Sequence, residues 1–144
     1  MNNKIILPLV FAIFISGCAS NGPTYTEIQP KLPELAEGKG RVYIFTKDVD
    51  RGGKIDINNQ YLGTLAWDDT FLYADLPEGS HTIKANSTGL IAIEYEYKFS
   101  LKAGETVFYE FERTWANIRL TKLEVDDVID TISKCRYAGT ASFK

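Results

Sequence analysis

Ile15-Ser16-Gly17-Cys18 is the stretch of this sequence whose residue types and spacing best fit a defined reaction. An apolar residue, two small residues and a cysteine form the pattern of a lipobox, in which the thiol receives diacylglycerol. The small side chains give a peptidase access to the backbone beside Cys18. We expect cleavage before Cys18 and acylation of its freed amine, because two or three acyl chains anchor stably where one is marginal.

The segment before Cys18 has the layout of a secretion signal. Lys4 and the amino terminus form a short positive region, and an apolar run from Ile5 to Ile15 is interrupted only by Pro8. That run suits a signal peptide and is too short to cross a bilayer as a helix. The alternatives are an ordinary secretion signal, with Cys18 incidental, or a buried core helix.

Ala19 and the overall charge indicate location and partners. Asp after the lipidated cysteine commonly marks retention in an inner membrane, so Ala19 favours the outer membrane, with the domain facing the periplasm. The formal net charge of -3 argues against a nucleic-acid partner, which requires a basic face. It also provides no basic patch for anionic lipids, so attachment to a membrane depends on the covalent lipid.

His81 and Cys135 are the other candidates for acid–base or nucleophilic chemistry. His81 is the single histidine, and no nucleophile or orienting acid stands at a catalytic spacing from it. We expect its ring to pack or hydrogen-bond at the start of a strand. Lipidation of Cys18 would leave Cys135 without an intrachain disulfide partner, and we expect its thiol to be buried. These residues predict no enzyme and no cofactor.

A partial echo of a calcium loop runs from Asp48 and Asp50 through Gly53 to Asp56. Gly52 fills a position that should supply an oxygen ligand, and Asn59 stands where a bidentate Glu is needed. We therefore expect a solvated loop and no metal site.

Trp67 and Trp115 are the candidate partner-binding residues. Each lies in a short connection among polar neighbours, and an exposed loop tryptophan often recognises a protein or a sugar. The alternative is that both rings fold back and close an end of the domain. The sequence leaves both possibilities open.

The chain divides into three parts: a signal peptide (1–17), a lipidated cysteine with a flexible tether (18–40) and one domain (41–144). The tether is expected because prolines and glycines interrupt any regular hydrophobic period between Ala19 and Gly40. From Arg41 onward, short apolar runs alternate with turn residues, which predicts an all-β fold. We expect a small antiparallel β-sandwich of about seven or eight strands with a short C-terminal helix.

Individual segments carry this prediction. Arg41 to Phe45 is apolar on both faces, as in a central strand, and Asn58-Asn59 suits a tight hairpin. From Ile91 to Leu101, apolar and polar residues alternate, so the odd positions should face the core. Ile118 and Leu120 differ in parity from Leu123, which suggests a bulge near Thr121 or Lys122.

The C-terminal helix is expected at about residues 125–136. Val125, Val128, Ile129 and Ile132 recur at helical spacing and predict one apolar stripe. Acidic residues follow its start and basic residues stand near its end, which suits the helix dipole.

Four segments occur in the order found in a known family: Arg41–Phe45, Ile55–Gly63, Leu76–Ile83 and Ala103–Tyr109. Over roughly Gly40 to Asp127 the chain resembles the bacterial lipoproteins catalogued as domain of unknown function twenty-eight forty-six. It is similar, more distantly, to PEGA-type carbohydrate- or surface-associated sandwich repeats. The resemblance implies a prealbumin- or immunoglobulin-like sandwich in the cell envelope, and it implies no established activity.

Together these observations predict a lipid-anchored, non-catalytic binding module of the bacterial envelope. Its expected partner, besides the membrane reached through the lipid, is another envelope protein or a cell-wall glycan. The alternative is a structural or accessory subunit of an envelope assembly. An envelope hydrolase is less favoured, because no nucleophile, base and acid stand together.

Overall fold

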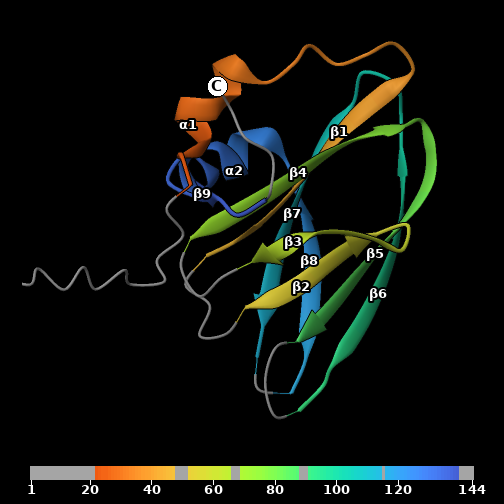
Figure 1. Ribbon diagram of the computed structural model, residues 1–144, viewed down its shortest axis with the longest axis vertical. Helices are drawn as coiled ribbons and strands as arrows, with labels where there is room; N and C mark the ends of the chain where they lie inside the picture. The colour runs from red at the N-terminus through yellow and green to blue at the C-terminus, as the bar shows by residue number, and fades with distance from the viewer. Residues whose placement is uncertain (1–21, 48–51, 66–68, 88–90, 115, 140–144) are drawn as a thin grey trace, which may run out of the picture.

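The computed structural model describes residues 22–47, 52–65, 69–87, 91–114 and 116–139. These residues form two β-sheets and two short α-helices (Figure 1). The five-stranded sheet contains β1 (Lys39–Thr46), β4 (Thr70–Pro77), β7 (Thr106–Arg113), β8 (Ile118–Leu123) and β9 (Arg136–Tyr137). The four-stranded sheet contains β2 (Gly53–Ile57), β3 (Gln60–Leu65), β5 (Gly79–Ser87) and β6 (Glu94–Leu101). The predicted all-β sandwich with a short C-terminal helix is confirmed.

The strand order is β8-β7-β1-β4-β9 in one sheet and β3-β2-β5-β6 in the other. Most neighbours are antiparallel, but β1 pairs in parallel with β7, and β4 pairs in parallel with β9. The expected antiparallel sandwich thus contains two parallel pairings that the sequence pattern does not predict. Successive strands from β1 to β7 reverse direction, so any two odd-numbered strands among them run the same way. β1 and β7 are therefore parallel when they become neighbours.

The two sheets enclose an aliphatic core. Because side chains alternate along a strand, β1 sends Val42 and Ile44 into this core and Tyr43 and Phe45 to the opposite face. β1 is thus buried on both sides, as its sequence predicts for a central strand. Most of the core side chains are Val, Ile and Leu from both sheets, with Tyr109 and Phe111 from β7.

A second core lies on the other face of the five-stranded sheet and is mainly aromatic. Rings from β1, β4, β7 and β9 contact one another there, with the Tyr43 and Phe108 centroids stacked 5.0 Å apart. Two helices cover these rings: α1 (Tyr25–Ile28), followed by the 3-10 helix η1 (Gln29–Lys31), and α2 (Val125–Ile132). Figure 1 shows α1 and α2 together on this side, away from β2, β5 and β6.

Residues 22–40 belong to the domain, so the predicted flexible tether over 18–40 is wrong for them. Tyr25 and Ile28 are buried in the aromatic core, where Ile28 is 0% exposed. The Thr24 amide donates to Glu27 Oε2 at 2.7 Å and starts α1 as a capping box does. The prolines and glycines of this segment shape a covering layer, which the aromatic face of the sheet requires. Residues 18–21 lie outside the described residues.

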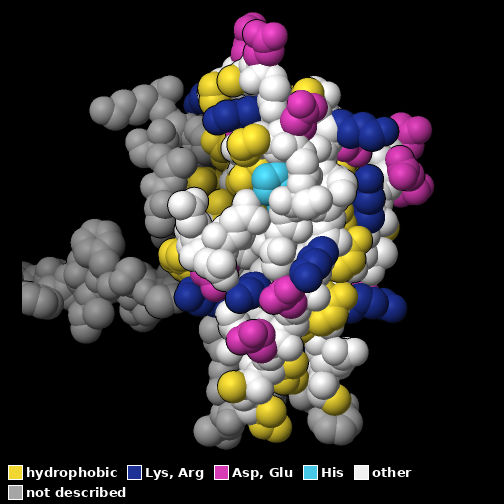
Figure 2. All heavy atoms as spheres, turned by 90° about the vertical axis from the view of Figure 1, so that its right-hand side faces the viewer, with side chains coloured by type: hydrophobic (Ala, Val, Ile, Leu, Met, Phe, Trp, Pro, Cys, Tyr) yellow, Lys and Arg dark blue, Asp and Glu magenta, His cyan; other side chains and the backbone are white. Residues whose placement is uncertain are grey.

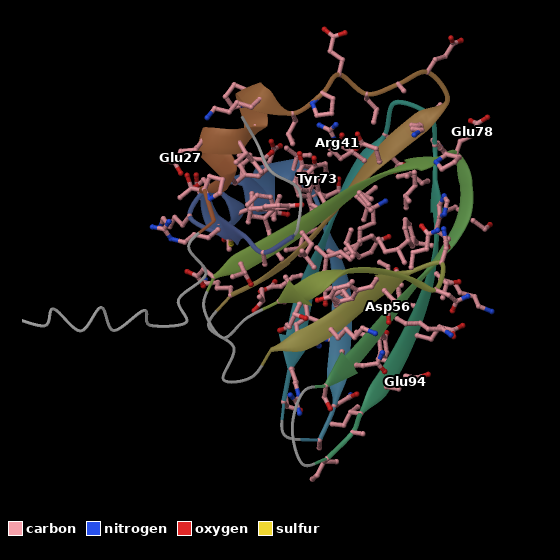
Figure 3. All side chains as sticks on the ribbon, in the orientation of Figure 1. Glu27, Arg41, Asp56, Tyr73, Glu78 and Glu94 are labelled. Atoms are coloured by element: carbon pink, nitrogen blue, oxygen red, sulfur yellow. The ribbon has the colours of Figure 1, made fainter. Side chains whose placement is uncertain are left out.

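Arg41 fastens this covering segment to the sheet. Its Nε donates to Asp75 Oδ1 at 2.6 Å, and its Nη2 donates to Asp75 Oδ2 at 2.7 Å. The same Nη2 also donates to the Pro33 carbonyl at 2.9 Å. The guanidinium lies 5.4 Å from the centre of the Tyr73 ring, and Figure 3 shows these two side chains beneath the segment that leads into β1. A forked arginine–carboxylate pair is specific in geometry and stronger than a neutral hydrogen bond.

The C-terminal helix is shorter than predicted and only part of its apolar stripe is buried. It ends at Ile132 instead of 136. Val128 and Ile132 are fully buried, whereas Val125 and Ile129 are 49% and 39% exposed. The stripe is wider than the surface on which the helix packs.

No bulge occurs at Thr121 or Lys122, contrary to the sequence-based expectation. β8 keeps one register against β7 from Leu123 opposite Phe108 to Ile118 opposite Arg113. The change of parity arises because the sheet has two cores: Leu120 faces the aliphatic core, and Leu123 packs against the aromatic one. The register shift among the described strands lies instead at Ile55 and Asp56, between β2 and β3.

The predicted alternation of β6 is confirmed over most of its length. Phe99 and Leu101 are buried, and Tyr95 and Tyr97 pack against the same core. Ile91, which we expected to face the core, is 60% exposed and precedes the strand.

The expected tight turn at Asn58-Asn59 is present, and a second tight turn lies at Gly104. Asn58 and Asn59 have φ values of 51° and 64° between β2 and β3, and Gly104 has a φ of 76° between β6 and β7.

Candidate functional site

An open hollow lies over β5 and β6, on the outer face of the four-stranded sheet. It has a volume of about 450 Å³ and is lined by Ser80, His81, Thr82, Lys98, Phe99 and Ser100. Ser80 pairs with Ser100 and Thr82 pairs with Lys98 across the two antiparallel strands. These four residues occupy even positions, which alternation places on the outer face. In Figure 2 the histidine has hydrophobic side chains on one side and backbone and uncharged polar side chains on the other, with basic and acidic side chains farther out.

The side chains of this hollow suit a hydroxylated or anionic ligand. The hydroxyls of Ser80, Thr82 and Ser100 can each donate and accept hydrogen bonds. The side chain of Lys98 is 81% exposed, and its Nζ lies 4.0 Å from Glu96 Oε1. An exposed ion pair at that distance is weak, so the ammonium can turn toward a ligand at little cost.

His81 is held in place by both ring nitrogens. Nε2 lies 2.7 Å from the Pro77 carbonyl, and Nδ1 lies 2.9 Å from the Asn58 amide nitrogen. Because a carbonyl can only accept, Nε2 carries the hydrogen and Nδ1 accepts from Asn58. The ring also packs 5.6 Å from Phe99, centroid to centroid. Neither nitrogen is available to take a proton from a substrate, and the expected packing role at the start of a strand is confirmed.

Asn58 joins this arrangement to the β2–β3 hairpin. The side-chain oxygen of Asn58 accepts a hydrogen bond from the Thr82 backbone amide at 3.1 Å. The backbone amide of Asn58 donates one to the Thr82 carbonyl at 2.9 Å. The floor of the hollow is therefore fixed by three strands, whereas its rim of hydroxyls and Lys98 faces solvent.

A smaller hollow of about 260 Å³ lies at the β7–β8 hairpin. It is lined by Glu112, Thr114, Asn117 and Arg119, and the Arg119 guanidinium lies 2.6 Å from Glu112 Oε2. The Thr114 hydroxyl accepts from the Asn117 amide at 3.1 Å. These side chains bind one another and shape the turn, which leaves fewer groups for a ligand than the larger hollow offers.

The residues that the sequence singles out as sites, Cys18, Trp67 and Trp115, lie outside the described residues. The strands that flank both tryptophans can nevertheless be compared. Thr46, at the end of β1, pairs with Thr70 at the start of β4 and with Phe111 near the end of β7. The connections that hold Trp67 and Trp115 thus leave the same end of the sandwich. The hollow lies toward the opposite end, near the β4–β5 turn.

Cys135 is buried, as predicted, and its thiol is kept protonated. Burial, with smaller contributions from Asp69 and Glu110, raises the pKa of this thiol to about 12. The Sγ atom lies 3.6 Å from the Thr131 carbonyl and 3.8 Å from the Thr46 carbonyl, which can accept its hydrogen. A protonated, enclosed thiol is a poor nucleophile.

Those residues of the calcium-like pattern that the structure describes do not converge on one point. Gly53 and Asp56 lie in β2, where the Asp56 carboxylate is 3.5 Å from Lys54 Nζ. Asp48 and Asp50 lie outside the described residues. Across the described ranges, no group of three or more His, Cys, Asp and Glu side chains is placed to hold a metal ion.

Sequence reasoning missed the hollow, although part of its signal was present. The alternation in Ile91–Leu101 places Lys98 and Ser100 on the wet face. What the sequence does not give is the partner strand and the register that set Ser80 and Thr82 beside them.

Among the described residues, no helix combines the length and apolar composition needed to cross a bilayer. Compared with models of protein families and with curated proteins, the chain matches neither a family model nor a curated sequence.

Proposed function

We propose that this chain is a lipid-anchored, non-catalytic binding module of the bacterial cell envelope. The anchor is an acylated Cys18, and Ala19 favours the outer membrane with the domain facing the periplasm. The partner is a cell-wall glycan or another envelope protein. The proposal includes kinship with the lipoproteins of domain of unknown function twenty-eight forty-six and, more distantly, with PEGA-type sandwiches.

The observation that carries a binding role is the hollow over β5 and β6. It offers three hydroxyls and the Lys98 ammonium, and both ring nitrogens of His81, the histidine in its lining, are held by hydrogen bonds. Sugar hydroxyls both donate and accept, so they complement serine and threonine hydroxyls directly. The two groups with catalytic potential support the same proposal, because His81 is fully hydrogen-bonded and Cys135 is buried.

The proposed kinship is supported by where the four shared segments fall. The first is β1, the second spans the β2–β3 hairpin, the third spans the β4–β5 turn and the fourth leads from a turn into β7. Each segment thus coincides with a central strand or a chain reversal, which are the positions that define a sandwich.

Co-sedimentation of the detergent-solubilised mature chain with purified cell-wall glycan tests the glycan partner. We expect the wild-type chain to sediment with the glycan and the Lys98→Glu variant to bind at least about tenfold more weakly, from the loss of an attractive contact and the gain of a repulsive one. Lys102→Glu is the matched control, since Lys102 is exposed outside the hollow and should bind like the wild type. Equal loss in both variants would indicate a general charge effect and contradict a site at the hollow.

Two further variants separate the hollow from the predicted loop surface. Trp67→Ala and Trp115→Ala should leave binding unchanged if the hollow holds the glycan. A loss confined to these variants would move the site to the loops. Absence of glycan binding, with the same envelope proteins recovered in fixed ratio after crosslinking, would favour the accessory-subunit alternative.

A further inference from the structure

The chain enters the domain along one edge of the five-stranded sheet. The Tyr137 amide donates to the Pro23 carbonyl at 2.9 Å, and the Tyr25 amide donates to the Cys135 carbonyl at 3.0 Å. Arg136 Nη1 adds a bond to the Gly22 carbonyl at 3.2 Å. Residues 22–25 therefore extend the sheet beyond β9. We call Gly22–Thr24 together with β9 the anchor edge.

The first residue of the anchor edge is tightly fitted. A β-carbon at Gly22 would overlap the Tyr137 carbonyl oxygen and approach other backbone atoms of the same residue. Backbone cannot yield as a flexible side chain can, so glycine is required for this close approach. The point at which the chain leaves the domain is therefore fixed on the surface.

Little chain remains between this point and the proposed lipid. Three residues, Ala19 to Asn21, separate Cys18 from Gly22. Four residue steps of extended chain span at most about 14 Å. A lipid on Cys18 therefore cannot be placed farther than this reach from the anchor edge.

Exposed basic side chains lie near the anchor edge, beside the acidic residues Glu27 and Asp69. Arg136, Lys134 and Lys31 are exposed there, and Arg136 and Lys31 both help to lower the pKa of Glu27 after the larger effect of its hydrogen bonds to Thr24. Figure 3 shows Glu27 beside α1, on the side opposite Asp56 and Glu94. Phosphate groups of lipid headgroups are anionic, so these basic side chains can contact them once the lipid brings the edge to the surface.

We propose that the anchor edge faces the phospholipid surface and that the hollow over β5 and β6 faces away from it. This inference rests on the proposed lipidation of Cys18. The strand order supports the claim that the hollow faces away from the phospholipid surface. In the four-stranded sheet, β3 lies beside the anchor edge through a bridge between Gly63 and Gly139, and β6 is the opposite edge. Three strand spacings separate these edges, or roughly 14 Å.

The orientation can be measured with a matched pair of labelled variants. Lys134→Cys places a fluorophore beside the anchor edge, and Lys98→Cys places one at the hollow; both lysines are exposed. Cys135 is buried and should react slowly, and labelling of the wild-type chain measures this background. The acylated chains are reconstituted into phosphatidylethanolamine–phosphatidylglycerol vesicles that carry a contact quencher on the lipid headgroup.

We expect at least about twofold more quenching at position 134 than at position 98, because position 134 lies beside the anchor edge and position 98 lies on β6, the strand farthest from that edge in its sheet. Equal quenching, or more quenching at position 98, in chains shown by mass to be acylated and vesicle-bound would overturn the orientation. Lack of acylation in the wild-type chain would instead refute the proposed anchor. These two failures are distinguishable.

A longer linker provides a second readout in the same assay. Twelve Gly and Ser residues inserted between Ala19 and Asn21 should leave vesicle binding intact, since the lipid is unchanged. The ratio of quenching at position 134 to quenching at position 98 should fall toward one, because a flexible linker of that length frees the domain to rotate. An undiminished difference would show that tether length does not set the orientation.

Discussion

The two outer faces of the sandwich differ in what they require from the rest of the chain. The outer face of the five-stranded sheet carries Tyr43, Phe71 and other rings, and two helices must cover it. The outer face of the four-stranded sheet carries Lys54, Lys84 and Glu96 and needs no cover. An apolar sheet face must be covered by other segments of the chain, whereas a polar face need not be. A segment without helical or strand periodicity can therefore still be part of the fold.

The largest contrast is expected between an aromatic residue under the helices and one on the bare face. Phe71→Ala should lower the free energy of unfolding by about 3–5 kcal/mol, because it empties a fully buried site. Tyr61→Ala, at a residue that is 55% exposed, should change it by no more than about 0.5 kcal/mol. Urea unfolding of the two variants measures the difference. Similar losses would mean that the two faces are not distinct.

Ile28→Ala tests whether the covering segment is part of the fold. Ile28 is 0% exposed, so truncation should cost about 2–5 kcal/mol. Gln29→Ala, at an exposed neighbouring position, is the control and should cost less than about 0.5 kcal/mol. If both variants melt at the wild-type temperature, residues 22–40 form a tether after all.

Ion pairs test the same comparison between the helix-covered face and the bare face. Asp75→Asn should cost about 2 kcal/mol, because it weakens a forked, partly buried pair and leaves the Arg41 charge short of a partner. Glu96→Gln, in an exposed pair 3.9 Å from Lys84, should cost at most about 0.5 kcal/mol. Addition of 0.5 M salt, roughly, should erase the second effect and leave most of the first.

Alkaline pH should weaken the helix-covered face. The pKa of Cys135 rises from 9.0 to about 12 on folding, and burial also raises the pKa of Tyr25 and Tyr43. A raised pKa means that the folded state holds its proton longer, so stability is full below the unfolded pKa and declines above it. For Cys135 the window is about pH 9 to 12, with a contribution of at most about 1.4 kcal/mol lost by pH 10.

The variant Cys135→Ala isolates that contribution. The loss of unfolding free energy between pH 7 and pH 10 should be smaller in the variant than in the wild type, because one titrating group is absent. An unchanged loss would assign the alkaline instability to the tyrosines alone.

Much of the sandwich could be predicted because its signal is local. Alternation fixed the faces of β6, and Asn58-Asn59 and Gly104 marked turns whose positive φ few residues tolerate. The two errors at the tether and at β8 share one physical cause: the domain has two cores, whereas alternation along a strand predicts only one. With a single core Leu123 requires a bulge, and Tyr25 and Ile28 belong to no element.

The candidate site was less predictable than the fold. The hollow depends on pairing between β5 and β6 and on the Asn58–His81 contact, which join segments distant in sequence. Local cues pointed instead to Cys18, through the lipobox, and to Trp67 and Trp115, whose residue type is conspicuous but whose surroundings in the fold no local pattern specifies.

The pairing of Gly22–Tyr25 with residues 135–137 has a consequence for the order of folding. Gly22 and Arg136 are separated by 114 positions in sequence, so this edge cannot close until nearly the whole domain has emerged. Contacts of such long range slow folding, because the entropy of closing a large loop is lost before the contact forms. The N-terminal segment therefore waits for the last strand, and a chain that stops before residue 135 would lack the edge that holds this segment, leaving part of the aromatic face exposed and prone to aggregation.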